Sequence, residues 1–274
     1  MPENVSAATF IVVRLSPLNN NPPHQIISQH FMSSTVLLID HHDNPRDDLA
    51  TTHLQRLGYE IDLCCPFQGD SLPDDNSKYV GAIIYGGAQN VTELEEFPFL
   101  QSEIDWLNDA IANNFPIIGI CLGAQLIAHC LGANVGHHAD ELCEFGYYPI
   151  IPTAEGRKWI SEPMHVTQAH YQHYDLPEGA VRLAYGENFQ NQAFRVGNNI
   201  FGLQFHPEVT ADIFRRWQNS DWAFYDRHGA QTREQQIQLM NKADRIQGDW
   251  FRWFLEYFFN QQQNSRTSPN LVTG

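Results

Sequence analysis

The sequence has few cysteines and no long apolar run. Five of its 274 residues are cysteines, and neither a Cys-x-x-Cys pair nor a zinc-type spacing of cysteine and histidine occurs. An odd number without such pairs does not fit a disulfide framework, so we expect a reduced, cytoplasmic protein. The longest apolar runs, Val36–Ile39 and Pro116–Gly119, are far shorter than the roughly 20 residues that cross a bilayer, which predicts a soluble protein without a membrane partner.

Basic residues are also scarce. Sixteen Lys and Arg stand against 32 Asp and Glu, which gives a formal net charge of −16. A field of this sign repels phosphate backbones, so nucleic acid is not an expected partner. The hydrophobic content of 42% with only 18% charged residues indicates a globular chain with a substantial core.

The chain divides into four parts by composition. Residues 1–31 include the Asn- and Pro-rich run 18–25 and are expected to form a flexible N-terminal extension, with a weak edge strand at 9–14 as the alternative. No signal peptide is expected there, because no basic residue precedes its short apolar patch. The following parts are the main domain 32–210, a helical extension of the same domain at 211–260 and a polar tail at 261–274.

Strand and helix patterns alternate in the main domain. Short apolar runs predict strands, and Leu100, Ile104, Leu107 and Ile111 have the spacing of an amphipathic helix. This alternation predicts an α/β fold with a doubly wound, mostly parallel, flavodoxin-like sheet. The expected strands are 35–40, 59–65, 79–85 and 116–120, and a helix is expected at 47–57, closed by Gly58.

The second half has a different pattern. Shorter strands are expected at 181–185, 192–196 and 200–205, joined by tight turns such as 197–199, as an antiparallel extension of the sheet. Further on, an aromatic stripe has helical spacing and indicates a helix packed on the core; the alternative is a surface for a partner. The stripe consists of Ile246, Trp250, Trp253, Phe254, Tyr257 and Phe258.

The most informative stretch is Gly119-Ile-Cys-Leu-Gly123, which lies between an apolar strand and a helix. This is the nucleophile-elbow arrangement with Cys121 in place of serine, and the two glycines relieve crowding in the sharp turn. A cysteine at a helix N-terminus is also favoured as the thiolate, the attacking species.

His206 follows 85 residues later, within the segment Gly-Leu-Gln-Phe-His-Pro-Glu. In an extended chain, residues i and i+2 point to the same side, so His206 and Glu208 are expected to lie together. The imidazole could then take the thiol proton while the carboxylate orients the ring. Cys121, His206 and Glu208 are therefore the predicted catalytic triad.

The motifs GICLGAQ and GLQFHPE resemble those of class I, triad-type glutamine amidotransferases. The preceding Gln192-Ala-Phe-Arg195 is similar to free-standing relatives of the amidotransferase domain of GMP synthase. The resemblance covers about 35–210 and implies that 32–210 is the catalytic domain. It also implies that Cys121 attacks the side-chain amide of glutamine and forms a γ-glutamyl thioester, which water then hydrolyses.

The same resemblance suggests the groups around the nucleophile. Gly86, Gly87 and the N–H of Leu122 would form the oxyanion hole. Gln125 and a loop at His170-Tyr171-Gln172 would bind the amino-acid end of the substrate. The sequence departs from the family at Gln172, where relatives carry an acidic residue, and at Ala88, where they often carry proline. These departures leave open which γ-glutamyl compound is the substrate.

Three functions remain open at this stage. The protein could be a glutaminase that supplies ammonia to a separate acceptor or synthetase, or a stand-alone γ-glutamyl peptidase. It could also be a catalytically quiet binding or regulatory protein on the same fold. The glycine-rich loop of the synthetase module of GMP synthase does not occur in the sequence.

The remaining histidines and cysteines are interpreted structurally. The histidine clusters at 41–43 and 137–140 are short loop segments, and adjacent side chains seldom converge on one ion. We therefore predict no metal and no cofactor. Cys64 and Cys65 are expected to pack in a strand, and Cys130 to be a small buried side chain on a helix.

Overall fold

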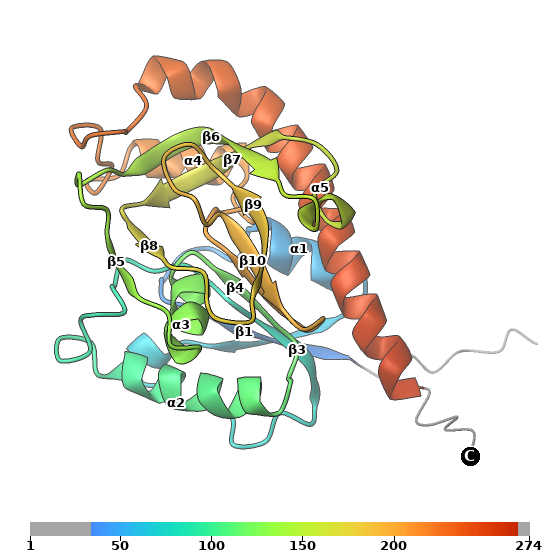
Figure 1. Ribbon diagram of the computed structural model, residues 1–274. Coiled ribbons are helices and arrows are strands. Elements are labelled where there is room, and N and C mark those ends of the chain that lie inside the picture. The colour runs from blue at the N-terminus through green and yellow to red at the C-terminus, as the bar shows by residue number, and fades with distance from the viewer. Residues whose placement is uncertain (1–33, 268–274) are drawn as a thin grey trace, which may run out of the picture. The chain divides into compact units, whose positions relative to one another are not determined.

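The computed structural model describes residues 34–267 (Figure 1), so the extension expected at 1–31 lies outside the described residues. The strands are β1 (Thr35–Ile39), β2 (Glu60–Cys64), β3 (Tyr79–Ile84), β4 (Ile117–Ile120), β5 (Val135–His137), β6 (Glu144–Pro152), β7 (Met164–His170), β8 (Gln172–Tyr174), β9 (Val181–Tyr185), β10 (Ala193–Val196) and β11 (Ile200–Leu203). The helices are α1 (Leu49–Arg56), α2 (Phe99–Ala112), α3 (Leu122–Cys130), α4 (Ala211–Gln218) and α5 (Arg233–Thr267), with short 3-10 turns at Pro66–Gln68 and Gly156–Lys158.

A nine-stranded sheet with the order β2-β1-β3-β4-β11-β10-β9-β6-β7 runs through the described part of the chain. Neighbouring strands from β2 to β11 are parallel, whereas β10, β9, β6 and β7 pair in antiparallel fashion. The predicted α/β class is therefore confirmed. Because β1, β3, β4 and β11 are parallel, the segments that follow them meet at one edge of the sheet, where open α/β sheets bind ligands.

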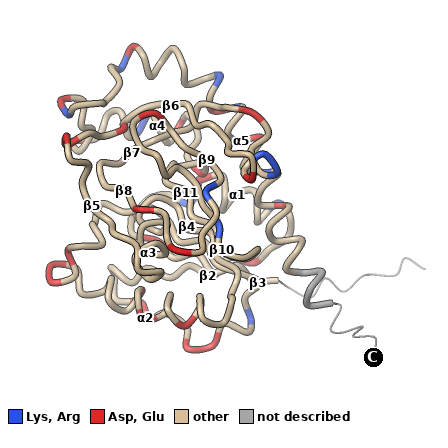
Figure 2. The backbone as a smooth tube through the Cα atoms, in the orientation of Figure 1, with Lys and Arg blue, Asp and Glu red and all other residues tan. Residues whose placement is uncertain are grey.

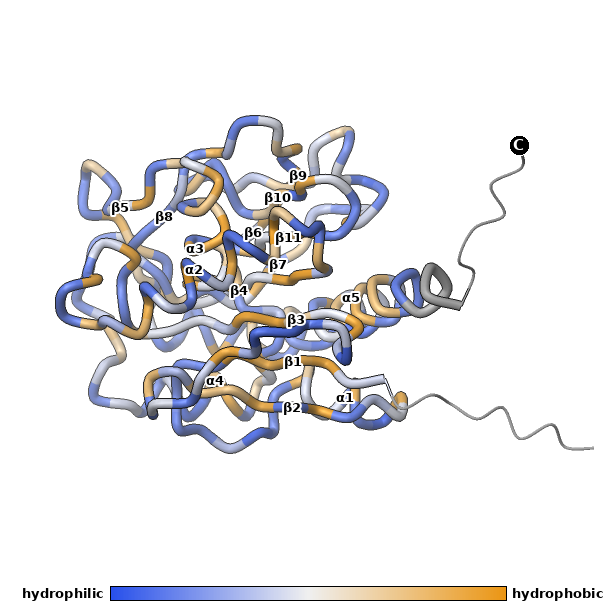
Figure 3. The backbone as a smooth tube through the Cα atoms, turned by 90° about the horizontal axis from the view of Figure 1, so that it is seen from below, coloured by the Kyte–Doolittle hydropathy of each residue, from blue (hydrophilic) through white to orange (hydrophobic). Residues whose placement is uncertain are grey.

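Alternation along the central strands divides the core into two layers. Val36 and Leu38 of β1 pack with one buried cluster, which includes residues of α1 and α5. Leu37 and Ile39 point to the opposite face and pack with α2 and α3. Figure 3 shows the hydrophobic colour along β1 and β3, as expected of strands covered on both faces. Helices on both faces make the sheet doubly wound.

The second half of the sheet differs from the prediction in two ways. The strand expected at 200–205 ends at Leu203, and it pairs parallel to β4 while also closing the antiparallel hairpin with β10. The antiparallel strands β6 and β7 were not predicted at all. β6 contains Pro149 and Pro152, and β7 reads MHVTQAH, so neither has a clear strand pattern.

Helix α5 packs on the core, but around a different face from the predicted stripe. Phe254 and Phe258 are buried as expected, together with Phe251, Leu255 and Phe259. Ile246, Trp253 and Tyr257 of the predicted stripe are instead exposed by 38%, 43% and 41%. The helix also continues to Thr267, past the point where the polar tail was expected to begin.

Acidic residues are spread over several elements and loops of the described fold (Figure 2). No helix between residues 34 and 267 is long and apolar enough to span a membrane.

Candidate active site

Cys121 occupies the sharp turn between β4 and α3. Its backbone has φ +51° and ψ −106°, a conformation that L-residues rarely adopt, and it is the N-cap of α3. The Cys121 N–H donates to the carbonyl oxygen of Leu203 at 2.8 Å, which ties the turn to β11. The strain therefore persists because the neighbouring strand holds the turn in place, and the side chain stands at the carboxyl edge of the sheet.

The two glycines of the elbow are required by close backbone contacts. A Cβ at Gly119 would lie 2.6 Å from the backbone of Gly123, and one at Gly123 would overlap the carbonyl oxygen of Ile84. No side chain fits at either position without moving β3, β4 or α3. The spacing seen in the sequence thus reflects the close approach of a helix to two strands.

His206 and Glu208 come from a turn that follows β11. The turn is closed by the N–H of Val209, which donates to the carbonyl of His206 at 3.4 Å. Nδ1 of His206 lies 2.8 Å from Oε1 of Glu208, and both side chains are buried. The expected pairing is present, but it is formed by a turn and not by the extended chain from which it was predicted.

The charge of His206 depends on its neighbours. Burial lowers the pKa of His206, but the charges of Glu208 and Cys121, and hydrogen bonds to both, outweigh burial and raise the pKa to about 10. His206 in this arrangement is therefore protonated at neutral pH. An imidazolium between a carboxylate and a sulfur atom is the partner that a cysteine thiolate requires.

Gln204 also reaches the sulfur atom. Its Nε2 donates to Sγ of Cys121 at 3.8 Å, and its Oε1 accepts from Nε2 of Gln125 at 3.4 Å. Gln204 is fully buried. No role was predicted for Gln204, although it lies within the GLQFHPE motif. A glutamine two residues before the histidine, directly after a buried strand, is the signal that points to it.

The helical C-terminal part supports the His206 turn from behind. Gln247 of α5 accepts from the N–H of Thr167 at 2.6 Å and donates to the carbonyls of His206 and Val209 at 3.1 and 3.3 Å. Trp217 of α4 packs edge-on against the His206 ring at 5.0 Å. The sequence signal for Gln247 is a polar residue one turn before Phe251 on the apolar face of its helix.

The predicted oxyanion groups lie next to the nucleophile. A Cβ at Gly86 would lie 2.6 Å from Cε1 of His206 and 3.3 Å from Cβ of Cys121. Among the described residues, the N–H groups of Gly86, Gly87 and Leu122 have no hydrogen-bond acceptor. Free N–H groups beside a nucleophile are what an oxyanion needs.

The residues predicted to bind substrate are brought together in the pocket that contains Cys121. Gln125 donates to the carbonyl of Gln172 at 3.1 Å. His170 ends β7 and Gln172 begins β8, so the expected loop is reduced to Tyr171. Both ring nitrogens of His170 have partners, the carbonyl of Gln172 at 2.9 Å and Glu144 at 3.2 Å. The buried Oε1 of Gln172 has none, which leaves an acceptor for a ligand.

These groups line one pocket of about 710 Å³. One side consists of the segments that follow the parallel strands, and the other of an aromatic wall that we define as Tyr171, Trp217, Trp222 and Phe224. Arg227 lies 4.4 Å over the Tyr171 ring and 5.4 Å over that of Phe224. Of this wall only Tyr171 was among the predicted residues, because Trp222, Phe224 and Arg227 lie in a segment without periodic pattern.

The histidine clusters and the remaining cysteines have other surroundings. Within 34–267, no three His, Cys, Asp or Glu side chains gather as a metal site would require. His41 pairs with Glu103, and His137 stacks on Tyr171.

Cys64 and Cys65 are buried, with Cys65 just beyond the end of β2. Cys130 is only partly buried, unlike the prediction, because it lies at the end of α3.

Residues 37–216 match the family described as glutamine amidotransferase class-I. The chain belongs to this family. The matched range includes the Cys121 elbow, the His206 turn and most of α4, and stops short of α5. Members of the class-I glutamine amidotransferase family are generally enzymes.

Individual relatives support the assignment. A glutamine amidotransferase-like protein of Salmonella typhimurium is 32% identical over 163 residues, which are 57% of this chain and 67% of the relative. The GMP synthase of Marinobacter nauticus is 32% identical over 168 residues, which are 55% of this chain but 30% of that enzyme. A crystal structure of a glutamine amidotransferase from Thermotoga maritima, 25% identical, has a TM-score of 0.73 over 82% of this chain and 98% of its own.

Proposed function

We propose that the protein hydrolyses the γ-carboxamide of glutamine or of a γ-glutamyl compound through a thioester on Cys121. The observation that carries the proposal is the hydrogen-bonded pair of His206 and Glu208, which lies beside Cys121 in a strained elbow. The raised pKa of His206 supports a thiolate–imidazolium pair. Membership of the family supports glutamine as the type of substrate.

In the first half of the reaction, the Cys121 thiolate attacks the amide carbon. The carbon–sulfur bond forms, the carbonyl electron pair moves onto oxygen, and the N–H groups of Gly87 and Leu122 stabilise the oxyanion. When the tetrahedral intermediate collapses, the carbon–nitrogen bond breaks and His206 gives its proton to the leaving nitrogen. Ammonia or an amine leaves, and the γ-glutamyl group stays on sulfur.

In the second half, His206 is neutral and can act as a base. It takes a proton from water, which attacks the thioester carbon, and the carbon–sulfur bond breaks as the intermediate collapses. Glutamate leaves, and the thiolate–imidazolium pair is restored. Glu208 orients the ring throughout and stabilises its positive charge, as the carboxylate of a triad does.

Ammonia would then be delivered to a separate acceptor or synthetase. The similarity to GMP synthases, named as glutamine-hydrolysing enzymes, supports this use. The match covers only 30% of the length of the Marinobacter nauticus enzyme. The separate partner that would use the ammonia therefore belongs to the proposal.

A second candidate is a γ-glutamyl peptidase, in which the leaving group is an amine larger than ammonia. The pocket of about 710 Å³ is in the range of sites for drug-sized ligands, more than an amino acid requires. Arg227 also has no carboxylate partner within the described part of the chain. An aromatic wall with a free cation suits a leaving group that carries a carboxylate.

Incubation with glutamine and with a panel of γ-glutamyl dipeptides distinguishes these functions. Release of ammonia from glutamine is the expected result for the first function, and release of the second amino acid for the second. Cys121→Ala is expected to abolish both, and a glutamine-like electrophile should add to Cys121, as detected by mass spectrometry. Turnover that survives Cys121→Ala contradicts the mechanism, and no turnover of any compound favours a binding or regulatory protein.

A further inference from the structure

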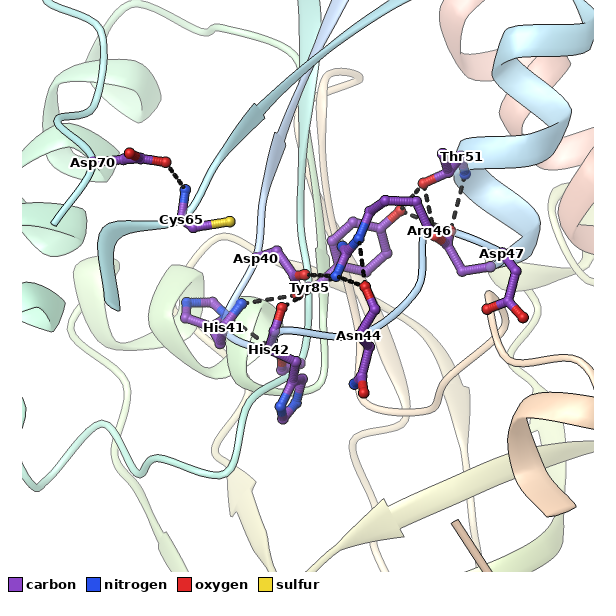
Figure 4. A network of polar contacts seen from close by, with 12 residues as sticks. Asp40, His41, His42, Asn44, Arg46, Asp47, Thr51, Cys65, Asp70 and Tyr85 are labelled. Carbon is purple, nitrogen blue, oxygen red and sulfur yellow. Dashed lines mark hydrogen bonds and ion pairs between the residues drawn. The ribbon is translucent and has the colours of Figure 1, made fainter. Parts of the chain in front are cut away.

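His41 is a buried histidine that the reaction described above does not use. It follows β1 at the carboxyl edge of the sheet, two residues after Ile39, and is 3% exposed. Figure 4 shows it in the polar network that extends from Asp40 to Arg46 and Tyr85. Its backbone is fixed there, because the N–H of His41 donates to Oδ1 of Asp40 at 2.8 Å, and Asp40 pairs with Arg46.

Both imidazole nitrogens of His41 face oxygen atoms. Nε2 lies 2.9 and 3.1 Å from the carboxylate oxygens of Glu103 on α2, and Nδ1 lies 3.3 Å from the carbonyl oxygen of Gly86. A neutral imidazole can donate to one of these partners, whereas the protonated ring can donate to both. Burial lowers the pKa of His41, but the charge and hydrogen bond of Glu103, together with the charge of Asp40 and the contact with Gly86, outweigh burial and raise the pKa above its ordinary value. Two acceptors, one at each ring nitrogen, favour the protonated ring that donates to both.

The contact with Gly86 matters because of what that peptide carries. In a trans peptide, the carbonyl of Gly86 and the N–H of Gly87 point in opposite directions from one plane. A hydrogen bond that holds the carbonyl on His41 therefore directs the N–H of Gly87 away from His41. Glycine on both sides leaves such a peptide free to rotate, so its orientation depends on an external contact. A Cβ at Gly87 would lie 2.9 Å from Cβ of His41, which shows how closely the two residues pack.

We propose that His41, held by Glu103, is a positioning residue that fixes the Gly86–Gly87 peptide so that the Gly87 N–H faces the oxygen of a carbonyl attacked by Cys121. This inference rests on the proposed function, because it assigns a purpose to the oxyanion hole. Through its two hydrogen bonds, His41 connects Glu103 on α2 to Gly86 after β3. Helix α2 otherwise contributes no side chain to the reaction.

Two substitutions separate the two hydrogen bonds of His41. The amide nitrogen of asparagine takes the place of Nδ1 and can keep the bond to Gly86. The amide nitrogen of glutamine takes the place of Nε2 and keeps only the bond toward Glu103. Each is combined with Glu103→Gln, so that no buried carboxylate is left without a cation. His41→Asn/Glu103→Gln and His41→Gln/Glu103→Gln thus differ in the contact with Gly86.

The test compares two reactions of Cys121 in the full chain. Acylation by 4-nitrophenyl acetate passes through an oxyanion, whereas alkylation by iodoacetamide displaces iodide at a saturated carbon and forms none. Loss of one oxyanion donor costs about 10²–10³ in rate, so the glutamine variant, in which the donor is misplaced, should be acylated about 10- to 100-fold more slowly. The asparagine variant should stay within about 3-fold of the native rate, and alkylation should hardly change in either.

His53→Gln is the matched control, because it disrupts another buried histidine paired with a glutamate, Glu256 at 2.9 Å, on α1 and α5. It should change neither reaction. Equal losses in both reactions, or equal acylation of the asparagine and glutamine variants, overturn the inference, and so does a native Cys121 that the ester does not acylate. If the ester acylates native Cys121 but no γ-glutamyl compound is turned over, the proposed function fails while the comparison of the variants still decides the role of His41.

Discussion

The two sides of the pocket are built in different ways. On the side of the parallel strands, Cys121, His206 and Glu208 are at most 6% exposed, and the glycines around them have no room for a methyl group. On the side of the C-terminal part, Trp222 is 49% exposed and Arg227 lies in an irregular segment at the surface. The first side is set by backbone contacts between strands, and the second by side chains on a loop.

We infer that the strand side holds the groups that react, and that the loop side selects the substrate. Strained and close-packed positions tolerate almost no substitution, because a shift of less than an ångström misplaces the reacting groups. Exposed aromatic and cationic side chains can change without disturbing the sheet. We therefore expect substitutions on the strand side to abolish turnover, and those on the loop side to change which compound is preferred.

The largest effect is expected for Glu208→Gln. Replacing the carboxylate of a triad by an amide lowers kcat by about 10²–10⁴-fold in comparable enzymes. The pH profile gives a second readout. Because Glu208, together with Cys121, raises the pKa of His206 to about 10, the variant should lose activity at a lower alkaline pH than the native protein.

The raised pKa of His206 also makes the stability of the fold depend on pH. The raised pKa of His206 stabilises the fold fully below the ordinary value of 6.5, and this contribution is lost as the pH rises through about 10. The native protein should therefore lose stability between these values more steeply than Glu208→Gln does, as measured by thermal unfolding. Identical pH profiles for the two proteins would contradict a paired His206.

Gly123→Ala is expected to have the next largest effect, this time on the fold. Its methyl group would overlap the carbonyl oxygen of Ile84, which is backbone and cannot rotate away. Overpacking of this kind costs about 1–3 kcal/mol and sometimes more, and it pushes α3 away from β3. Unfolding in urea measures the cost. Gly136→Ala, where a Cβ has open space, is the matched control and should be nearly neutral.

Gln247→Leu tests whether helix α5 holds the His206 turn in place. The substitution removes the partner of the Thr167 N–H and of the Val209 carbonyl, and one of the two partners of the His206 carbonyl. A buried group left unpaired costs about 1–3 kcal/mol, so the melting temperature should fall, and kcat with it, because the His206 turn loosens. Gln238→Leu, at an exposed position of the same helix, should change stability by less than about 0.5 kcal/mol.

The strand side could be predicted from the sequence because its patterns are short. The apolar runs of β1, β3 and β4 and the glycine spacing around Cys121 each lie within a few consecutive residues, although the contact that requires Gly123 comes from Ile84 on β3. The loop side, apart from Tyr171, could not, since Phe224 and Tyr171 meet across 53 residues of sequence and neither lies in a periodic pattern. His41 and Gln247 fall between these cases. Each is a polar residue beside a buried strand or on an apolar helix face, but its partner, Gly86 or Thr167, is set by the tertiary fold.

The smallest effect is expected for Arg227→Met, which keeps much of the side-chain length and removes the charge. An exposed ion pair contributes about 0.2–1 kcal/mol, so the KM for a γ-glutamyl dipeptide with a free carboxylate should rise by up to about 5-fold. The KM for glutamine should rise by less, because ammonia as leaving group does not reach the wall.

The difference between the two substrates should shrink at high salt, where exposed charges are screened. Arg252→Met is the matched control, since this arginine pairs with Asp249 on α5 and does not line the pocket. A parallel rise of KM for both substrates would place Arg227 at the γ-glutamyl group that they share. The aromatic wall would then hold the acyl part of the substrate, and both sides of the pocket would take part in binding it.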